Sequence, residues 1–186
     1  MVTGRLVVMG SGEMAPSLAS THRAALTAAG TDEVVVLDSP FGFQENADEL
    51  SERLRTYFTR SIGAKAEVAS LRAVDLDAVE VERARNSIAS ARAVFAGPGS
   101  PSYALAVWRA HGIGNLLRGV LDRGGSVILS SAAALTAGSH TLPVYEIYKV
   151  GQDPHWLEGL NLLDRLGLRA VVIPHWNNAE GGTHDT

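Results

Sequence analysis

The chain alternates short apolar runs with longer stretches of helical character, and this alternation constrains its fold more than any other feature. The apolar runs are residues 6–9, 34–37, 67–69, 93–96, 126–129 and 170–173. Each is apolar nearly throughout, which is typical of strands buried on both faces of a parallel sheet. Helical character falls on residues 17–29, 46–61, 79–91, 103–111 and 115–123. The alternation predicts an α/β domain with a doubly wound, mostly parallel sheet and helices on both faces.

Length and composition limit the classes of protein that fit. A chain of 186 residues suits one domain spanning residues 1–186, with a well-buried core. Sixteen basic and 20 acidic residues give a net charge of −4, so we expect no nucleic-acid or membrane partner. No stretch approaches the roughly 20 apolar residues that span a bilayer, and no signal peptide is visible. We therefore expect a soluble cytoplasmic domain, and the sequence leaves open whether it forms a homodimer.

The absence of cysteine excludes several kinds of chemistry. A chain without cysteine has no disulfide framework, no thiolate nucleophile and no cysteine-ligated metal. Any nucleophile must therefore come from another residue type.

Doubly wound sheets bind ligands in the loops beyond the carboxyl ends of their strands. The loop after the first predicted strand, residues 10–16, is a glycine-rich turn of the kind that can hold a phosphate. It lacks the third glycine of a dinucleotide fingerprint, and no Gly-Lys-Ser/Thr follows. We favour a tight turn that brings backbone close to the site.

The loop after the fourth predicted strand, residues 97–102, contains two glycines and two prolines. Such a loop has an unusual backbone shape, and its free N–H groups can form an oxyanion pocket. Proline has no N–H, so Gly99 and Ser100 are the expected donors. A rigid turn with Ser102 as the cap of the next helix is an equally good interpretation, and both interpretations can be correct at once.

Two serines follow the fifth predicted strand and precede a run of small residues. A serine on a sharp strand-to-helix turn forms a nucleophile elbow. Leu129 and Ala133 occupy the flanking positions that are glycine in the usual elbow around Ser131. On the pattern alone, Ser130 or Ser131 as a helix N-cap is the stronger interpretation.

His175 directly follows the last predicted strand, where a general base would be well placed. A structural histidine and a plain glycine turn are alternatives. A third alternative is a metal site formed by His175, His184 and Asp185, a two-histidine, one-carboxylate set.

A carboxylate is needed to orient such a base. Residues 143–151 alternate enough to predict a strand, which places Glu146 among aromatic residues. Asp153, Glu158 and Asp164 are other choices, but each falls in a predicted exposed loop or helix.

The chain resembles the serine peptidases of the dipeptidase E and cyanophycinase type, with a class I glutamine amidotransferase-like, flavodoxin-like fold. The matching segments are the Gly-Pro-Gly-Ser loop, Ser-Ala-Ala-Ala-Leu-Thr-Ala-Gly, and Pro-His-Trp-Asn-Asn-Ala. The resemblance implies Ser131 as nucleophile, His175 as base and Glu146 as acid, with Gly99 and Ala132 as oxyanion donors. It implies small peptides or amides as substrates, including peptides with acidic residues, and no cofactor.

Other functions stay open beside this one. Leu129, Ala133 and Pro98 stand where the family has smaller residues, which motivates an inactive relative that binds a small ligand or a protein partner in the same pocket. A metal-dependent hydrolase is the third hypothesis. Glutamine amidotransfer needs a cysteine nucleophile and is excluded. Family members usually continue beyond the 11 residues that follow His175 here, so the sequence leaves open whether the chain is truncated at its C-terminus.

Overall fold

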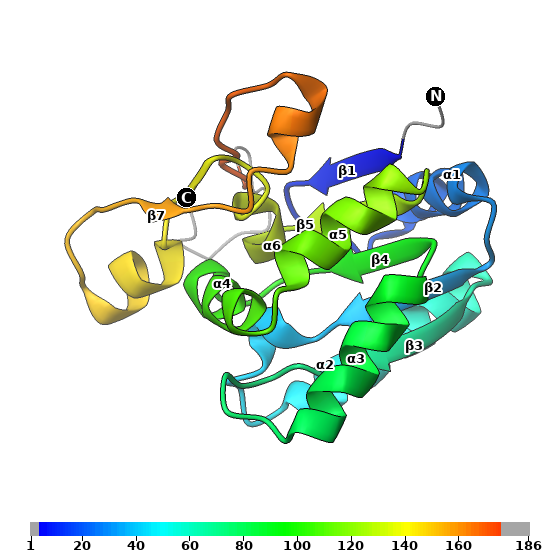
Figure 1. Cartoon of the computed structure of the whole chain (residues 1–186), viewed down its shortest axis with the longest axis horizontal. Coiled ribbons are helices and arrows are strands. Elements are labelled where there is room, and N and C mark those ends of the chain that lie inside the picture. The colour runs from blue at the N-terminus through cyan, green and yellow to red at the C-terminus, as the bar shows by residue number, and fades with distance from the viewer. Residues whose placement is uncertain (1–3, 176–186) are drawn as a thin grey trace.

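The computed structural model describes residues 4–175. Its centre is a five-stranded parallel sheet in the order β1-β5-β4-β2-β3 (Figure 1). The strands are β1 (Arg5–Met9), β2 (Glu33–Leu37), β3 (Lys65–Ala69), β4 (Ala93–Ala96) and β5 (Ser126–Ser130). Five of the six predicted strands are therefore confirmed.

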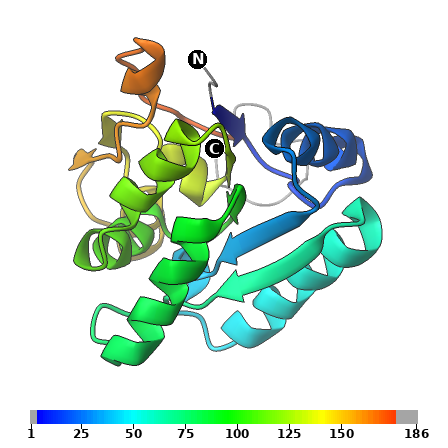
Figure 2. The ribbon, with the colours of Figure 1, turned by 45° about the vertical axis from the view of Figure 1, so that its right-hand side comes forward.

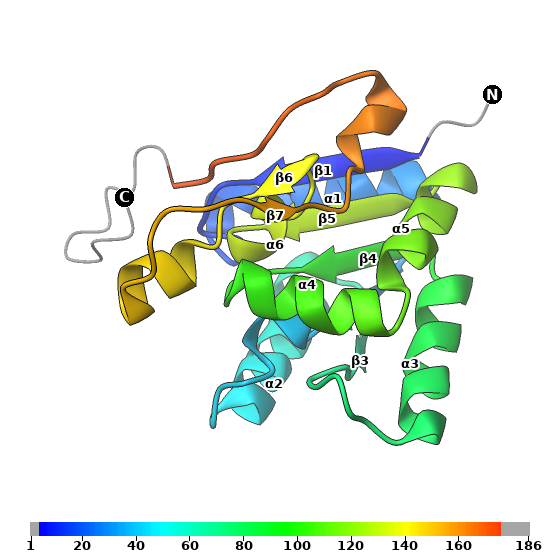
Figure 3. The same ribbon diagram turned by 60° about the vertical axis from the view of Figure 1, so that its left-hand side comes forward.

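Helices cover both faces of the sheet, as the alternation predicted (Figures 2 and 3). One face packs against α1 (Ala19–Ala29) and α2 (Ala47–Tyr57). The other packs against α3 (Ala78–Ser90), α4 (Pro101–Ala110) and α5 (Ile113–Asp122). Short helical turns η1 (Pro16–Leu18), η2 (Ser39–Phe41) and η3 (Phe58–Ile62) flank these helices. The doubly wound α/β fold is confirmed.

Each central strand supplies side chains to both layers of the core, because successive residues of a strand point to opposite faces. In β4, Val94 and Ala96 pack on the side of α3, α4 and α5, whereas Phe95 packs on the side of α1 and α2. Trp108 of α4 is completely buried. This two-sided burial explains why the strands read as uninterrupted apolar runs.

The chain beyond β5 leaves the sheet. It forms α6 (Ala132–Leu135), the small antiparallel pair β6 (His140–Thr141) and β7 (Leu157–Glu158), the π-helical turn η4 (Glu146–Val150) and η5 (Leu163–Leu166). Figure 3 labels the β6–β7 pair, which is separate from the five-stranded sheet.

Two sequence predictions fail in this region. Residues 143–151 form a helical turn instead of a strand, because the Ile147 N–H donates to the Pro143 carbonyl at 3.1 Å and closes the turn locally. Residues 170–173 form no strand. Val171 and Ile173 are 41% and 60% exposed, and the Ala170 carbonyl instead accepts from the Ser139 N–H at 3.1 Å.

Within residues 4–175, no helix is long and apolar enough to cross a membrane.

Candidate active site

The loops that leave the carboxyl ends of β1, β2, β4 and β5 are tied to one another by backbone hydrogen bonds. The Ser131 N–H, at the end of β5, donates to the Met9 carbonyl of β1 at 3.1 Å. The Ser100 N–H, after β4, donates to the Pro40 carbonyl, after β2, at 2.7 Å. The Ala133 N–H, just after Ser131, donates to the Gly97 carbonyl, after β4, at 3.2 Å, and so links the candidate nucleophile to the proposed oxyanion loop.

Ser131 has the backbone of a strained elbow. Its φ and ψ are 51° and −120°, and its side chain caps no helix N–H. Such a conformation costs a non-glycine residue on the order of 1–3 kcal/mol and is characteristic of functional sites. The Ser131 Oγ instead lies 2.8 Å from His175 Nε2. The capping interpretation that the pattern favoured is therefore wrong for Ser131.

The two departures from the usual elbow sequence are accommodated by the fold. Leu129 is completely buried in the core beside α3, α4 and α5, so its bulk does not lie in the site. Ala133 lies in α6, where a helical backbone suits alanine, and its N–H donates to the Gly97 carbonyl at 3.2 Å. Neither residue obstructs Ser131.

The loop after β4 requires glycine at position 99. Gly99 has a φ of 138°, and a Cβ there would lie 1.9 Å from the Pro40 carbonyl oxygen. Gly99 and Ala132 both line the cavity that contains Ser131. Their N–H groups have no hydrogen-bond partner in the part of the chain that the structure describes. These two N–H groups can receive an oxyanion.

Ser100 does not meet the expectation of an oxyanion donor, because its N–H is taken by Pro40. Its Oγ accepts from the Tyr103 N–H at 3.1 Å and caps α4. Ser100, and not Ser102, is therefore the cap of that helix.

Glu146 lies at the start of η4, against the loop after β4. Its Oε1 accepts a hydrogen bond from Ser100 Oγ at 3.0 Å. Its Oε2 is buried and has no hydrogen-bond partner among residues 4–175. Glu146 is not one of the described residues that line the cavity. The structure brings Ser131 and His175 together, and it places Glu146 beside Ser100. The other carboxylates considered, Asp153, Glu158 and Asp164, are exposed.

Ser131 and His175 open into a cavity of about 620 Å³. Apolar and aromatic side chains form most of its wall: Pro98, Leu135, Leu142, Val144, Tyr145, Tyr148 and Ile173. Gln44 and Lys149 add polar groups. Most of these wall residues could not be predicted from the sequence, because they come from α6, η4 and the connecting loops and have no characteristic spacing.

Glu13 is a buried residue that sequence reasoning also missed. It lies in the glycine-rich turn after β1, and its Oε2 accepts from Ser130 Oγ at 3.0 Å. Its backbone carbonyl accepts from Nε2 of the fully buried His22 at 2.8 Å. Burial lowers the pKa of His22, which keeps the ring neutral. A Cβ at Gly10 would lie 3.5 Å from the His175 N, so the turn does bring backbone close to the site.

The hypothesis of a metal site depends on His184 and Asp185, which lie outside the residues that the structure describes. Trp176 also lies outside them. Among residues 4–175, no group of three or more histidine, aspartate or glutamate side chains could hold a metal ion.

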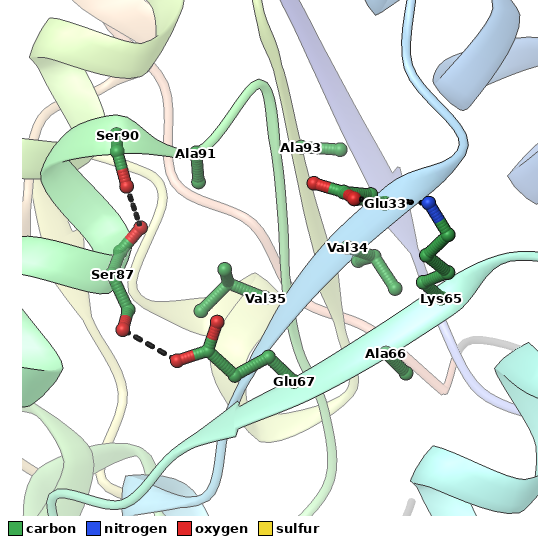
Figure 4. Close-up of a pocket in the computed structure, with 10 residues that line it drawn as sticks. All are labelled: Glu33, Val34, Val35, Lys65, Ala66, Glu67, Ser87, Ser90, Ala91 and Ala93. Atoms are coloured by element: carbon green, nitrogen blue, oxygen red, sulfur yellow. Dashed lines mark hydrogen bonds and ion pairs between the residues drawn. The ribbon is translucent and has the colours of Figure 1, made fainter.

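A second hollow, of about 260 Å³, lies at the amino ends of β2, β3 and β4 (Figure 4). Its charged groups are paired: Lys65 Nζ lies 3.3 Å from Glu33 Oε1, and Ser87 Oγ donates to Glu67 Oε1 at 2.5 Å. Parallel sheets bind their ligands at the opposite, carboxyl end. We therefore place the candidate site at Ser131 and not in this hollow.

Comparison with known proteins relates the chain to others through its fold. No protein-family model matches the sequence, and no curated protein matches it. A peptidase from an acI-B1 Actinobacterium has a similar structure, with a TM-score of 0.73 and 20% identity over 95% of this chain and 70% of that one. A protein named as a candidate peptidase E from Listeria monocytogenes EGD-e has a TM-score of 0.65 and 16% identity, over 96% of this chain and 82% of its own. This chain shares the α/β fold of these peptidase E-like structures.

Proposed function

We propose that this chain is a serine hydrolase that cleaves small peptides or amides. The observation that carries the proposal is the 2.8 Å contact between Ser131 Oγ and His175 Nε2, on an elbow with positive φ. A serine hydroxyl within hydrogen-bond reach of an imidazole is the arrangement that activates a nucleophile. The names of the two similar structures, both peptidases, also support it.

The proposed reaction is acyl transfer. His175 Nε2 accepts the Ser131 proton as Oγ attacks the substrate carbonyl carbon, and the oxygen of the tetrahedral intermediate receives the N–H groups of Gly99 and Ala132. The imidazolium then gives its proton to the leaving amine. A water molecule, activated by the same histidine, hydrolyses the acyl-enzyme. Ser131 and His175 belong to one chain, so this chemistry does not require a homodimer.

Glu146 is our proposed acid, which would accept a hydrogen bond from His175 Nδ1 and hold the ring in the right tautomer. The buried Oε2 makes no hydrogen bond to His175 or to any other described residue, and because a buried acceptor is costly when unpaired, this oxygen is available for the role. Glu146→Gln keeps the size of the side chain and an acceptor for Ser100. We expect turnover to fall at least tenfold with little change in the melting temperature.

Glu158→Gln is the matched control, since Glu158 is an exposed glutamate outside the cavity. If Glu146→Gln and Glu158→Gln were equally active, Glu146 would have no part in the reaction, and the acid would have to be sought elsewhere.

The alternative is an inactive relative that binds a ligand or a protein partner in the same pocket. That alternative predicts Ser131 as an ordinary helix cap, whereas its hydroxyl meets an imidazole. A mass-spectrometric screen of dipeptides, including aspartyl dipeptides and a cyanophycin fragment, separates the two functions. Cleavage that Ser131→Ala abolishes supports the hydrolase. Binding without cleavage by the folded wild type supports the inactive relative.

A further inference from the structure

The wall of the cavity is mostly apolar, and it carries one lysine, Lys149. Leu135, Leu142, Val144 and Ile173 supply aliphatic surface. None of the described lining residues is an aspartate or glutamate. Lys149 is the exposed cation of this set. The wall therefore suits apolar substrate side chains, and its charge suits an anionic group.

Lys149 has no ion pair or hydrogen bond within residues 4–175. The other lysine of the chain, Lys65, lies 3.3 Å from Glu33 and 3.8 Å from Asp32. An ammonium group at the rim of the cavity that no described residue neutralises is available to a substrate.

The backbone that carries Lys149 is fixed relative to the oxyanion loop. Three residues before it, Glu146 is hydrogen-bonded to Ser100 at 3.0 Å. The neighbouring Tyr145 ring packs edge-to-face on Phe43, with centroids 5.3 Å apart. The start of η4, which lies beside the cavity and precedes Lys149 by three residues, is therefore held by both contacts.

We propose that Lys149 binds the α-carboxylate of short peptides whose side chains are apolar; this inference rests on the proposed hydrolase function. A carboxylate on a substrate side chain, buried against the aliphatic wall, would lose water without gaining a partner. The terminal carboxylate of a dipeptide can instead stay at the exposed rim, where Lys149 lies. The site then distinguishes a free C-terminus from a blocked one.

The test compares Leu-Phe with Leu-Phe amide and with Asp-Phe, using wild type, Lys149→Gln and the control Lys65→Gln. We expect wild type and Lys65→Gln to prefer Leu-Phe over its amide about tenfold in kcat/KM, as one charged hydrogen bond implies. In Lys149→Gln the ratio should fall to about one. Asp-Phe should be a poorer substrate than Leu-Phe.

Two results would overturn the inference. One is a free-acid preference that is absent in wild type or persists in Lys149→Gln. The other is a preference for Asp-Phe that disappears in Lys149→Gln, because Lys149 would then bind the acidic side chain.

Labelling by a fluorophosphonate, which has no carboxylate, separates this failure from failure of the proposed function. If wild type is labelled and cleaves peptides but the ratios do not change, the role of Lys149 alone is refuted. If the folded wild type is neither labelled nor active, the hydrolase proposal and this inference are both refuted.

Discussion

Gly99→Ala should displace the oxyanion loop and so lower both the stability and the activity of the protein. The added Cβ would lie 1.9 Å from the Pro40 carbonyl oxygen, whereas real Cβ contacts are essentially never under 3.0 Å. The backbone must therefore move by at least the difference, 1.1 Å. That movement breaks the 2.7 Å hydrogen bond from the Ser100 N–H to Pro40, and the φ of 138° adds strain.

We expect a loss of roughly 2–4 kcal/mol in the free energy of unfolding, from strain and the lost hydrogen bond together. For a domain of this size that lowers the melting temperature by roughly 5–15 °C. Displacing one oxyanion donor should lower turnover by about 10²–10³-fold.

Gly63→Ala is the matched control. Gly63 also has a positive φ, of 82°, but a Cβ there would meet nothing within 4 Å. It should lose about 1 kcal/mol and no activity. Calorimetry and turnover on the same samples, measured below both melting temperatures, give the comparison. If Gly99→Ala matched Gly63→Ala in activity, the assignment of Gly99 to the oxyanion pocket would be refuted.

Two further predictions concern buried polar side chains. Asp38 is completely buried and accepts from Ser70, the Leu71 N–H and Arg72, so Asp38→Asn should cost about 3 kcal/mol and lower the melting temperature by roughly 6–12 °C. Asp48→Asn removes the exposed partner of the same arginine and should change the melting temperature, measured by calorimetry, only a little. If the two variants lowered the melting temperature equally, burial would not be what makes Asp38 important. Burial is the chief reason that the pKa of His22 lies below 6.5. In mild acid the unfolded chain therefore binds more protons than the folded chain. The contribution of His22 to the free energy of unfolding must fall as the pH decreases through and below 6.5. The melting temperature of His22→Gln should vary less than that of wild type between pH 7.5 and 5, and identical slopes would show that His22 is not responsible.

The sheet could be predicted from the sequence because strands that are buried on both faces consist almost entirely of apolar residues. Residues 93–96 are apolar throughout because Val94 and Phe95 pack on opposite layers. Residues 170–173 are equally apolar and form no strand. An apolar run becomes a strand only where a neighbouring strand pairs with it, and the Ala170 carbonyl instead accepts from the N–H of Ser139, which lies outside any strand and 31 residues earlier in the sequence.

The candidate site was predictable in its parts but not in its geometry. Ser131 and His175 each follow a predicted strand, yet only the fold shows that their side chains meet at 2.8 Å. Ser100 could have been recognised as the cap of α4 from Pro101, since proline is favoured at the first helical position. The hydrogen bond of the Ser100 N–H could not be predicted, because its acceptor, the Pro40 carbonyl, lies 60 residues earlier in the sequence.

Two single charged residues outside the main helices and strands could not be predicted to have a role. Glu13 and Lys149 have no partner at a characteristic spacing in the sequence. Their roles depend on what the folded chain places beside them, which is Ser130 for Glu13 and the apolar cavity for Lys149.

The most direct test of the proposed hydrolase compares Ser131→Ala with Ser130→Ala. The two serines are adjacent, but Ser130 Oγ donates to Glu13 and Ser131 Oγ meets His175. Intact-mass measurement after fluorophosphonate treatment should show one added group on wild type and on Ser130→Ala, mapping to Ser131, and none on Ser131→Ala. Folded wild type that takes up no label, or a Ser131→Ala protein labelled as fully as wild type, would contradict the account.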